Sequence, residues 1–247
     1  MTRAAPLDEP PPPVPSSHPV DFRPLSPPDK APIDGTWCRL EPLDPGRHGA
    51  DLAELALAGD PATAESWRYL PYGPFADREA YEANLTSQAA SGDPVFFAVI
   101  DHDAGGRARG VLSLMRIEPE QGCIEIGNIW FPPALQRRRA ASEAVMRAVE
   151  AALLAGYRRV EWKCDAANAP SRRAAERFGF RFEGVFRRHR VVKGRNRDTA
   201  WFSIVEEEAP ARLAAYRRWL DPANFDADGR QRGSLTRPDP VAGVANS

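Results

Sequence analysis

The pattern of apolar and polar residues between Ile124 and Phe182 predicts a strand followed by an amphipathic helix, and then further short elements. Residues 124–131 form an apolar run broken by one charged residue, which is typical of a largely buried strand. After a basic turn, Val145, Val149 and Leu153 recur every four residues. This spacing gives a helix one apolar face, so the helix is expected to pack on the sheet.

The second half of this stretch repeats the pattern with a shorter helix. Residues 160–165 alternate apolar and charged with the period of two that is typical of a strand. Asn168 then opens a short helix, because Pro170 suits its first turn and Gly179 suits the position just after its end. A further strand is expected around Phe180 and Phe182.

The turn between the first strand and the long helix carries three consecutive arginines, Arg137 to Arg139, after Gln136. Free backbone N–H groups and the helix dipole point outward at a helix N-terminus. Arginine side chains add charge that pairs with phosphate. The sequence therefore predicts an anion-binding site at this turn, suited to a phosphate-rich ligand.

Several short motifs in this order resemble the GNAT acyl-CoA N-acetyltransferases, and among them the RimJ/RimL-type branch. They comprise Glu125-Ile126-Gly127 in the strand, Gln136-x-x-x-x-Ala141 in the turn, Glu143-Ala144 in the helix, Asn168-x-x-Ser171, and Gly179-Phe180-x-x-Glu183-Gly184. The resemblance covers roughly Trp37 to Val205. It implies an α/β (α+β) fold with a mixed, mostly antiparallel central sheet flanked by helices. It also implies an acyltransferase that uses acetyl-CoA as co-substrate, without a metal.

The resemblance assigns the acetyl-CoA site to three segments. Asn168 would hold the pantetheine arm, and the strand N–H groups near Ile129 to Phe131 would align that arm and polarise the acetyl carbonyl. The expected cofactor-binding residues are Ile129, Trp130, Phe131, Gln136, Arg137, Arg138, Arg139, Ala140, Ala141, Asn168 and Ser171.

The chain departs from the family pattern at two positions. Arg139 stands where the turn has its first glycine, and arginine lacks the freedom of glycine at positive φ. We expect the turn to keep negative φ at Arg139, with its side chain pointing away; the alternative is an altered phosphate cradle. Many GNAT enzymes have a tyrosine seven residues after the asparagine, where this chain has Ala175.

Two residues are the candidates for catalysis. Glu125 lies on the strand beside the expected thioester, and a carboxylate in a half-buried cleft has its pKa raised toward the range of a useful base. The alternatives are that Glu125 is a structural partner of a backbone group or an arginine, or that water acts as the base. Ser171 is the substitute for the missing tyrosine as the donor to the thiolate, as the resemblance to RimL-type enzymes implies. Its alternative role is a helix-start hydroxyl.

The acceptor must present a neutral amine. Deprotonation near pH 7 costs roughly 4–5 kcal/mol for lysine and about 1 kcal/mol for an α-amino group, so an N-terminus asks less of the base. An aromatic loop carries Trp67, Tyr69 and Tyr72, which are candidate substrate-binding residues by resemblance. The alternative is that one or two of them pack on the sheet.

The remaining segments complete the predicted organisation. Residues 1–33 hold eleven prolines and predict a disordered arm, and a plain extended arm is favoured over a proline-recognition role. Residues 34–209 are predicted to form the acetyltransferase domain. Residues 210–247 are predicted to form a short helix and an irregular tail. Helices are predicted around Leu52, after the cap Asp60 and after the cap Asp77. Hairpins are predicted over 95–117 and over 186–205, the latter linked by residues 193–198.

Composition narrows the function classes. The 247-residue chain is 43% hydrophobic with a net charge of −1, which argues against a general binder of polyanions. No apolar run approaches membrane-spanning length and the N-terminus has no apolar signal core, so we expect a cytoplasmic protein without a membrane partner. Its three cysteines, Cys38, Cys123 and Cys164, and its four histidines show no metal-ligand spacing.

We therefore expect an N-acetyltransferase that moves acetyl from acetyl-CoA directly to a primary amine, on a protein N-terminus or a small molecule, in a ternary complex. No Gly-x-Ser-x-Gly, Walker or Gly-x-Gly-x-x-Gly motif is present, which disfavours serine hydrolases and nucleotide enzymes. The main alternative is a non-catalytic acyl-CoA-binding or regulatory module. A nucleic-acid binder with a basic hairpin is the second, since residues 181–197 hold seven basic residues and one acid. The acceptor, the preferred acyl chain, and whether the protein is a monomer or homodimer stay open.

Overall fold

The computed structural model describes residues 21–235 of the chain. The predicted N-terminal arm lies outside the described residues up to position 20, and the predicted tail lies outside them from position 236. Residues 21–32 run along the domain without regular structure; the Leu25 amide donates to the carbonyl of Pro119 (3.2 Å), and Phe22 packs under Arg158.

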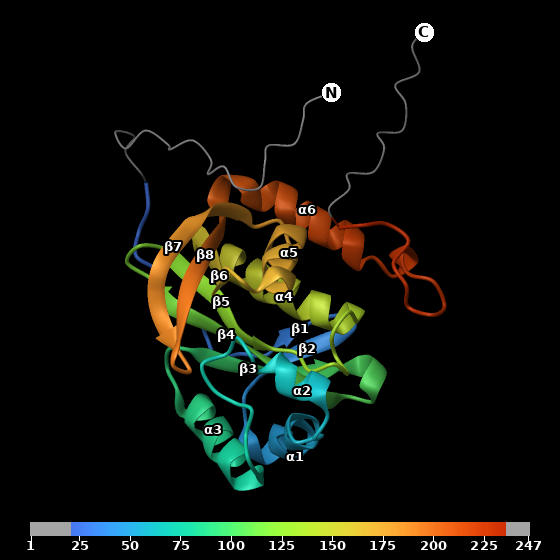
Figure 1. Ribbon diagram of the computed structural model, residues 1–247. Coiled ribbons are helices and arrows are strands. Elements are labelled where there is room, and N and C mark those ends of the chain that lie inside the picture. The colour runs from blue at the N-terminus through green and yellow to red at the C-terminus, as the bar shows by residue number, and fades with distance from the viewer. Residues whose placement is uncertain (1–20, 236–247) are drawn as a thin grey trace.

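Within the described part, eight strands form one twisted sheet (Figure 1). In spatial order they are β1 (Ile33–Asp34), β2 (Cys38–Pro42), β3 (Val95–Asp101), β4 (Arg107–Glu118), β5 (Cys123–Trp130), β6 (Arg159–Asp165), β8 (Arg195–Val205) and β7 (Arg181–Val192). All neighbours are antiparallel except β5 and β6, which are parallel. The predicted mixed, mostly antiparallel sheet is confirmed.

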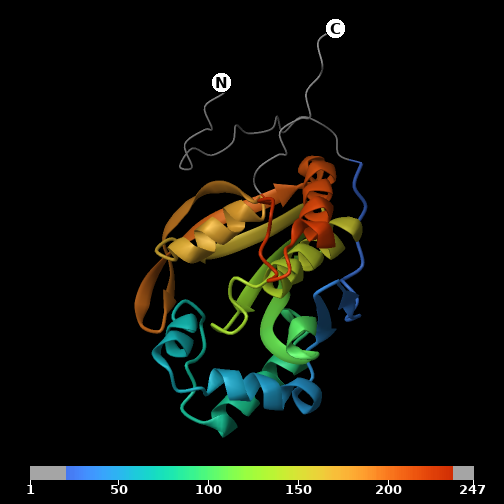
Figure 2. The same ribbon diagram turned by 90° about the vertical axis from the view of Figure 1, so that its right-hand side faces the viewer.

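Helices lie on both faces of the sheet, as Figures 1 and 2 show. They are α1 (Pro45–Ala56), α2 (Pro61–Ser66), α3 (Arg78–Ala90), α4 (Arg139–Leu154), α5 (Ala169–Arg177) and α6 (Ala209–Leu220), with short 3-10 turns at His102–Ala104, Glu206–Glu208 and Pro222–Asn224. The predicted caps Asp60, Asp77 and Asn168 each accept a backbone N–H at the start of a helix. Gly179 follows α5 with φ of 87°, as a residue after a helix end requires.

Alternation along the strands divides the interior into two cores. On β3, Phe97 and Val99 face a large core under α4, while Phe96 and Ala98 face a smaller core under α1 and α3. The larger core contains the apolar face of α4 that its spacing predicted, including Val145 and Val149. Because α1 and α3 cover only part of their face, the strands β5 to β8 have a face that carries polar side chains instead.

A buried carboxylate ties α4 to the first strands. Glu143 is fully buried, and its two oxygens accept N–H bonds from Thr36, Trp37 and Cys38 at 2.8, 2.6 and 3.0 Å. Arg147 on the next turn of α4 pairs with it at 3.2 Å. Gly35 lies against this carboxylate so closely that a Cβ there would come within 2.6 Å of it. These bonds fix β1 and β2 against the helix.

The last hairpin is longer than the sequence predicted. Strand pairing continues to Val192 and Arg195, so the connection is Lys193-Gly194 alone rather than residues 193–198. Both turn residues have positive φ, 49° and 72°, which is the conformation of a two-residue hairpin turn. The polar residues 195–198 are therefore strand residues, and their lack of apolar alternation concealed this.

Candidate functional site

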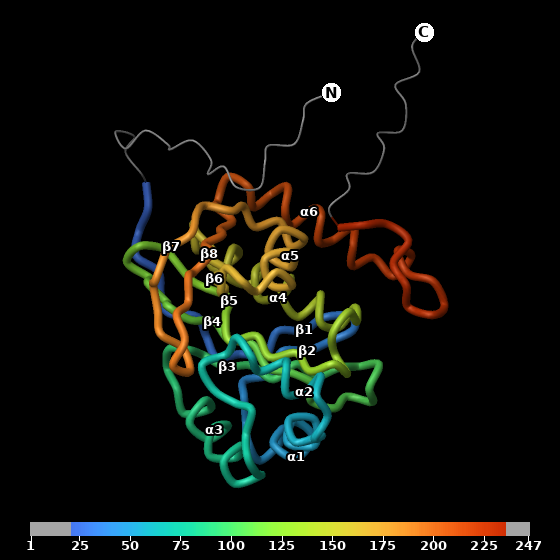
Figure 3. The backbone as a smooth tube through the Cα atoms, viewed as in Figure 1, coloured from blue at the N-terminus to red at the C-terminus, as the bar shows by residue number. Residues whose placement is uncertain are grey.

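Strands β5 and β6 separate in the middle of the sheet. They pair from Cys123 to Glu125, and beyond Glu125 the two described strands no longer hydrogen-bond each other. The tube trace in Figure 3 shows the two strands diverging toward α4 and α5. A wedge-shaped opening at the centre of an otherwise continuous sheet exposes backbone groups of β5, so it is a natural place for a ligand.

A bulge in β5 accompanies the separation. Ser113 of β4 pairs with Gly127 and Val111 pairs with Trp130, so β5 has one residue more than β4 over this distance. Asn128 takes the irregular conformation, with φ of 49°. Its Nδ2 donates to the Ser113 hydroxyl at 3.1 Å, and that hydroxyl donates to the carbonyl of Gly127 at 3.1 Å. These side-chain bonds hold the bulge, which turns the end of β5 away from β6.

A cavity of about 1190 Å³ fills the opening and continues over the start of α4. Its walls come from the end of β5, the basic turn, the first turns of α4 and α5, and a segment after α6. Of the residues predicted to bind the cofactor, those that line it are Ile129, Phe131, Gln136, Arg137, Arg138, Arg139, Ala141, Asn168 and Ser171. Trp130 and Ala140 do not line it, because both are buried in the cores at 1% exposure.

The basic turn presents a helix N-terminus to this cavity. Gln136 Nε2 donates to the carbonyl of Phe131 (2.8 Å) and Arg138 Nε donates to the carbonyl of Ala134 (2.7 Å), so side chains brace the turn. Arg138 occupies the cap position of α4 without any side-chain cap bond. Gln136, Arg137 and Arg138 are exposed. The first N–H groups of α4 and two arginines are thus available to an anion.

Arg139 has a different task from its neighbours. It does not have positive φ, which confirms the expectation for its backbone; Arg137 has positive φ instead, at 62°. The Arg139 guanidinium makes two 2.8 Å hydrogen bonds to Asp103 and lies 5.0 Å from the Trp37 ring and 5.8 Å from the Phe225 ring. It therefore joins four segments of the chain, with its charge already matched by a carboxylate.

The start of α5 brings two predicted residues to the cavity. The Asn168 side chain accepts the Ser171 N–H at 3.1 Å, which caps the helix. The Ser171 hydroxyl accepts a hydrogen bond from Trp162 Nε1 at 3.0 Å, and it also hydrogen-bonds the Cys164 thiol. Ala175, at the position of the family tyrosine, is fully buried.

Arg177 lines the cavity, although the sequence did not single it out as a site residue. Its Nη1 donates to the Ser142 hydroxyl at 3.0 Å, and its guanidinium lies over the rings of Phe178 and Trp219. Among residues 21–235 it has no carboxylate partner, and burial lowers its pKa. A half-buried cation without a counter-charge is a site for an anionic group.

The segment after α6 also escaped sequence analysis, which predicted an irregular tail there. It has no regular element beyond a 3-10 turn and a bridge between Phe225 and Gln231, yet it packs on the domain. Phe225 meets the rings of Trp37 (4.7 Å) and Trp219 (5.0 Å) edge-on. Residues 228–231 line the cavity beside the basic turn. Its sequence has no apolar period that would have announced this contact.

The predicted aromatic wall is only partly in the cavity. Tyr69 lines it, and its hydroxyl donates to the carbonyl of Ala167 at 3.3 Å. Trp67 is 1% exposed and stacks on Trp130 with ring centres 4.3 Å apart, so it belongs to the smaller core. The ring of Tyr72 packs edge-on against Trp67 beside that core.

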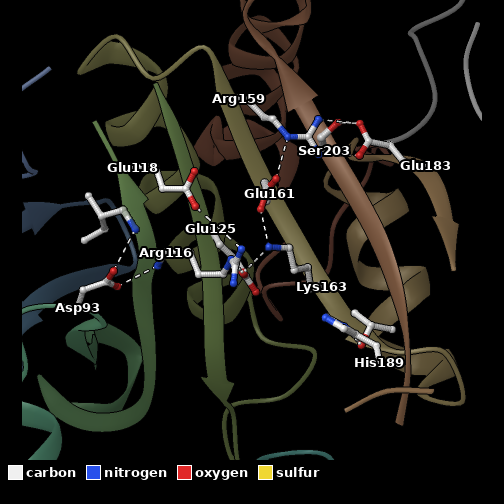
Figure 4. Close-up of polar contacts among 12 residues, drawn as sticks. Asp93, Arg116, Glu118, Glu125, Arg159, Glu161, Lys163, Glu183, His189 and Ser203 are labelled. Atoms are coloured by element: carbon white, nitrogen blue, oxygen red, sulfur yellow. Dashed lines mark hydrogen bonds and ion pairs between the residues drawn. The ribbon is translucent and has the colours of Figure 1, made fainter. Parts of the chain in front are cut away.

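Glu125 lies on the sheet face opposite the cavity, at the last paired position of β5 and β6 (Figure 4). It is 5% exposed, and its Oε2 is 3.1 Å from Lys163 Nζ and 3.6 Å from Arg116 Nε. Burial raises the pKa of Glu125, and the positive charge of Lys163 opposes this rise. The Glu125 carboxylate is therefore buried and paired with cationic side chains, and it does not line the cavity.

A chain of ion pairs continues from Glu125 across the sheet. Lys163 is 2.6 Å from Glu161, Glu161 is 2.8 Å from Arg159, and Arg159 makes two bonds of 2.6 and 2.7 Å to Glu183 (Figure 4). Lys163 also lies 3.8 Å from the centre of the Trp201 ring. These partners come from β6, β7 and β8, so only the assembled sheet brings them together.

Residues 21–235 contain no group of three or more histidine, cysteine, aspartate or glutamate side chains placed to hold a metal ion. No helix in that range is both long enough and apolar enough to cross a bilayer. Cys38, Cys123 and Cys164 are free thiols.

Comparisons with known proteins agree with this geometry. Residues 39–181 match the family model of the acetyltransferase (GNAT) domain. A crystal structure of a GCN5-related N-acetyltransferase from Brucella melitensis is 46% identical, covers 87% of this chain and 96% of its own, and has a TM-score of 0.83. A protein from Chromobacterium violaceum ATCC 12472, described as a probable GNAT-family acetyltransferase, is 42% identical over 81% of this chain and 99% of its own, with a TM-score of 0.73.

A more distant likeness concerns the fold alone. The Salmonella typhimurium acetyl transferase that modifies the N-terminal serine of ribosomal protein L7/L12 is 21% identical. It covers 70% of this chain and 98% of its own, with a TM-score of 0.60. No curated protein matches the chain.

Proposed function

Because the chain belongs to the GNAT acetyltransferase family, whose domains use acetyl-CoA and transfer acetyl to amines, we propose that it acetylates a primary amine by direct transfer in a ternary complex. The observation that carries this proposal is the cavity between the separated strands β5 and β6, bordered by the N-terminus of α4 and by Ser171. Such a site brings an anion-binding turn and a hydroxyl donor to the same opening.

The cavity has the charge pattern that coenzyme A requires. Its outer part carries the uncapped start of α4 with Arg137 and Arg138, which suit a pyrophosphate. Arg177 adds a half-buried cation without a carboxylate partner in the described chain. Apolar side chains, including Ile129 and Trp162, also line the cavity and suit the pantetheine arm.

The reaction needs one proton removed and one supplied. Bound acetyl-CoA supplies the thioester. After the ammonium has lost one proton to the base, the amine nitrogen forms a bond to the acetyl carbon and the carbon–sulfur bond breaks. The nitrogen then loses a second proton, which ends on the sulfur, so coenzyme A leaves as a thiol. Ser171 is assigned to donate a hydrogen bond to the leaving sulfur, because it lines the cavity and Trp162 holds its oxygen in place. Backbone N–H groups at the end of β5 stabilise the negative charge on the carbonyl oxygen.

Glu125 is assigned to accept the proton from the acceptor ammonium. It lies at the point where β5 and β6 part, on the face opposite the cofactor cavity, so an amine reaches the opening from that face. Its pKa is raised by burial, which makes it a stronger base than an exposed glutamate. Because the carboxylate does not line the cavity, one water between it and the amine completes the path.

An α-amino group is the acceptor that this arrangement serves best. Its pKa of about 7.7–8.0 leaves a substantial neutral fraction near pH 7, whereas lysine at about 10.4 does not. A glutamate base held by a lysine is a modest base, so it suits the easier deprotonation. We therefore propose a peptide or protein N-terminus rather than a lysine side chain as the substrate.

Calorimetric titration with acetyl-CoA, followed by thiol release with peptide acceptors, tests the proposal. We expect micromolar binding that requires the pantetheine arm, so that ATP does not substitute, and turnover with an unblocked N-terminus but not with its acetylated form. Binding without any thiol release would identify a non-catalytic acyl-CoA-binding module. Absence of binding would refute the cofactor assignment itself.

The serine assignment has its own test. Ser171→Ala is expected to lower kcat about 100-fold with little change in the KM for acetyl-CoA, because the hydroxyl acts on the leaving group. Ser171→Thr keeps a hydroxyl and is the matched control, expected to retain more activity. An unchanged kcat in Ser171→Ala would reduce Ser171 to a helix-start residue.

A further inference from the structure

The outermost strand of the sheet, β7, exposes a surface that the proposed reaction does not yet use. We call it the basic hairpin face and define it as Phe186, Arg187, Arg188 and Arg190. Phe186 is 55% exposed and Val191 is 78% exposed, which is unusual for residues of a strand. Figures 1 and 3 show β7 at the edge of the sheet, beside β8.

One carboxylate of the described chain, Asp198, lies near the cations of this face: it accepts the Arg188 N–H at 2.7 Å, and the charges of Arg187 and Arg188 contribute to lowering its pKa. Arg181 pairs with Glu208 at 3.3 Å, and Lys193 donates to the carbonyl of Trp67 at 2.8 Å. By contrast, Arg187, Arg188 and Arg190 form no ion pair with any residue from 21 to 235. Three arginines beside a single carboxylate leave this strand segment with an excess of positive charge, which favours an external anion.

Two cations of the hairpin lie at facing positions of the two strands, where their like charges repel each other. Arg190 lies directly opposite Arg197 in the β7–β8 ladder. Like charges at facing positions of antiparallel strands destabilise the pair. An anion bound between the two strands would remove that repulsion, so the hairpin is best satisfied when a negative group occupies it.

A bulge turns the arginines out of the ladder. Phe186 pairs with Thr199 and Arg190 pairs with Arg197, so β7 has two residues more than β8 over this interval. Arg188 has φ of 52°, and its N–H donates to Asp198 at 2.7 Å. A bulge at this position re-aims Arg187, Arg188 and His189 away from regular strand directions.

An aromatic path connects this face to the proposed base. The Phe186 ring lies 4.8 Å from the Trp201 ring, and Trp201 lies 3.8 Å from Lys163 Nζ. Lys163 in turn is 3.1 Å from Glu125. A chain lying on the basic hairpin face therefore ends close to the carboxylate that accepts the proton.

We propose that the acceptor is the N-terminus of an acidic peptide segment, whose carboxylates bind the unpaired arginines of the basic hairpin face while its α-amine reaches the opening between β5 and β6. This inference rests on the proposed function and names its substrate class. Polyamines and aminoglycoside-like amines carry positive charge, so the same arginines repel them. The exposed Phe186 adds an apolar contact that a peptide uses and an inorganic anion does not.

His189 provides a reporter that is independent of turnover. Its Nδ1 is 3.0 Å from the Thr199 hydroxyl, and its ring is 5.5 Å from that of Phe186. The pKa of His189 is lowered by burial and by the charges of Arg190, Arg197, Lys163 and Arg116, which belong to four different strands. Carboxylates bound among these cations are expected to raise that pKa.

The test uses the full-length protein and three peptides that share an N-terminal serine. One continues with glutamate and aspartate, one with glutamine and asparagine, and one with lysine and arginine; spermidine is a fourth acceptor. We expect the acidic peptide to have a KM about tenfold below that of the neutral peptide, with similar kcat, and the basic peptide and spermidine to be the poorest acceptors. Added salt should reduce the preference.

Substitutions on β7 test whether its arginines cause the preference for the acidic peptide. Replacing both Arg187→Gln and Arg190→Gln should reduce the acidic-to-neutral KM ratio to about twofold, while Arg217→Gln on α6, an exposed arginine far from β7, should preserve it. Nuclear magnetic resonance titration of His189, assigned with His189→Gln, should show a higher pKa with the acidic peptide and no change with the neutral one.

Several results would overturn the inference while leaving the acetyltransferase proposal intact. Equal KM values for the three peptides would do so, as would a preference for spermidine. Displacement of the acidic peptide by a single-stranded oligonucleotide at lower concentration would assign the face to nucleic acid. Sedimentation showing a dimer that Phe186→Ser dissociates would assign it to a second copy. Loss of thiol release with every amine, with His189 still responding to the acidic peptide, would instead refute the proposed function alone.

Discussion

The two faces of the β5–β6 opening are built on different principles. The cofactor face uses backbone geometry: a bulge held by Ser113 and Asn128, an uncapped helix start, and exposed arginines. The opposite face uses buried charge: Glu125 and Lys163 side chains are 7% and 6% exposed and lie 3.1 Å apart. Shape and exposed cations govern affinity on the first face. On the second, a few desolvated groups govern protonation, so single substitutions there should act mainly on rate and pH dependence.

The largest expected effect comes from removing the buried carboxylate. Glu125→Gln keeps the size of the side chain but cannot accept a proton, so kcat should fall by about 100-fold or more. The acidic limb of the pH–rate profile should disappear. In the wild type, that limb should lie above the usual range of glutamate, since burial raises the Glu125 pKa and activity is lost as pH falls through it. An unchanged profile in Glu125→Gln would exclude Glu125 as the base.

Charge reversal on the cofactor face should change affinity rather than rate. Arg137→Glu combined with Arg138→Glu is expected to raise the KM for acetyl-CoA about 30-fold, because two phosphate-binding charges become repulsive. The kcat at saturation should stay within about twofold of the wild type. Arg217→Glu is the matched control for the general effect of charge. A KM equal to that of the control would remove the phosphate assignment.

A substitution of Lys163 tests whether buried charge on the second face governs the protonation of Glu125. Lys163→Met removes the cation that opposes the rise in the Glu125 pKa, so the acidic limb should move to higher pH. Activity at high pH should recover, which a merely structural defect would not allow. Because unpairing a buried charge costs stability, the unfolding midpoint of the variant must be measured beside the profile. If the acidic limb stays at the same pH in Lys163→Met, Lys163 does not influence the pKa of the catalytic base.

The smallest effect is expected at Arg139, whose charge is already paired. Arg139→Ala should lower the free energy of unfolding by about 1 kcal/mol, a modest value since Asp103 is more than a third exposed. Arg139 lowers the Asp103 pKa, so the contribution is present above pH 4 and is lost as pH falls through the lowered pKa. Urea unfolding at pH 7 and pH 3 should therefore show the difference closing in acid. A KM for acetyl-CoA raised as strongly as in the Arg137 and Arg138 variant would make Arg139 a phosphate ligand as well.

Sequence patterns predicted the structural features that depend on residues close to one another in the sequence. The helix face of Val145 and Val149 and the caps Asp60, Asp77 and Asn168 express local rules, and the structure has them where expected. The basic turn and Ser171 line the cavity for the same reason, because a strand, a turn and a helix start are contiguous.

What the sequence did not reveal depends on partners far along the chain. Arg177 meets Ser142 across 35 positions, and Phe225 packs on Trp37. Lys163 pairs with Glu125 because β6 runs parallel to β5, which is visible only once the strand order is known. Trp67, an apparent wall residue, is stacked in a core by Trp130. No period or spacing encodes such contacts.

The buried Glu143 has a consequence for how the protein folds during its synthesis. It accepts N–H bonds from residues 105 to 107 positions earlier in the chain. During synthesis, β1 and β2 leave the ribosome long before their carboxylate acceptor exists, and contacts so distant in sequence form slowly. Phe225 extends the delay, since it packs on Trp37 from near the C-terminal end of the described residues. The first strands are therefore expected to assemble last, and nascent chains halted before α4 should be the ones that chaperones hold.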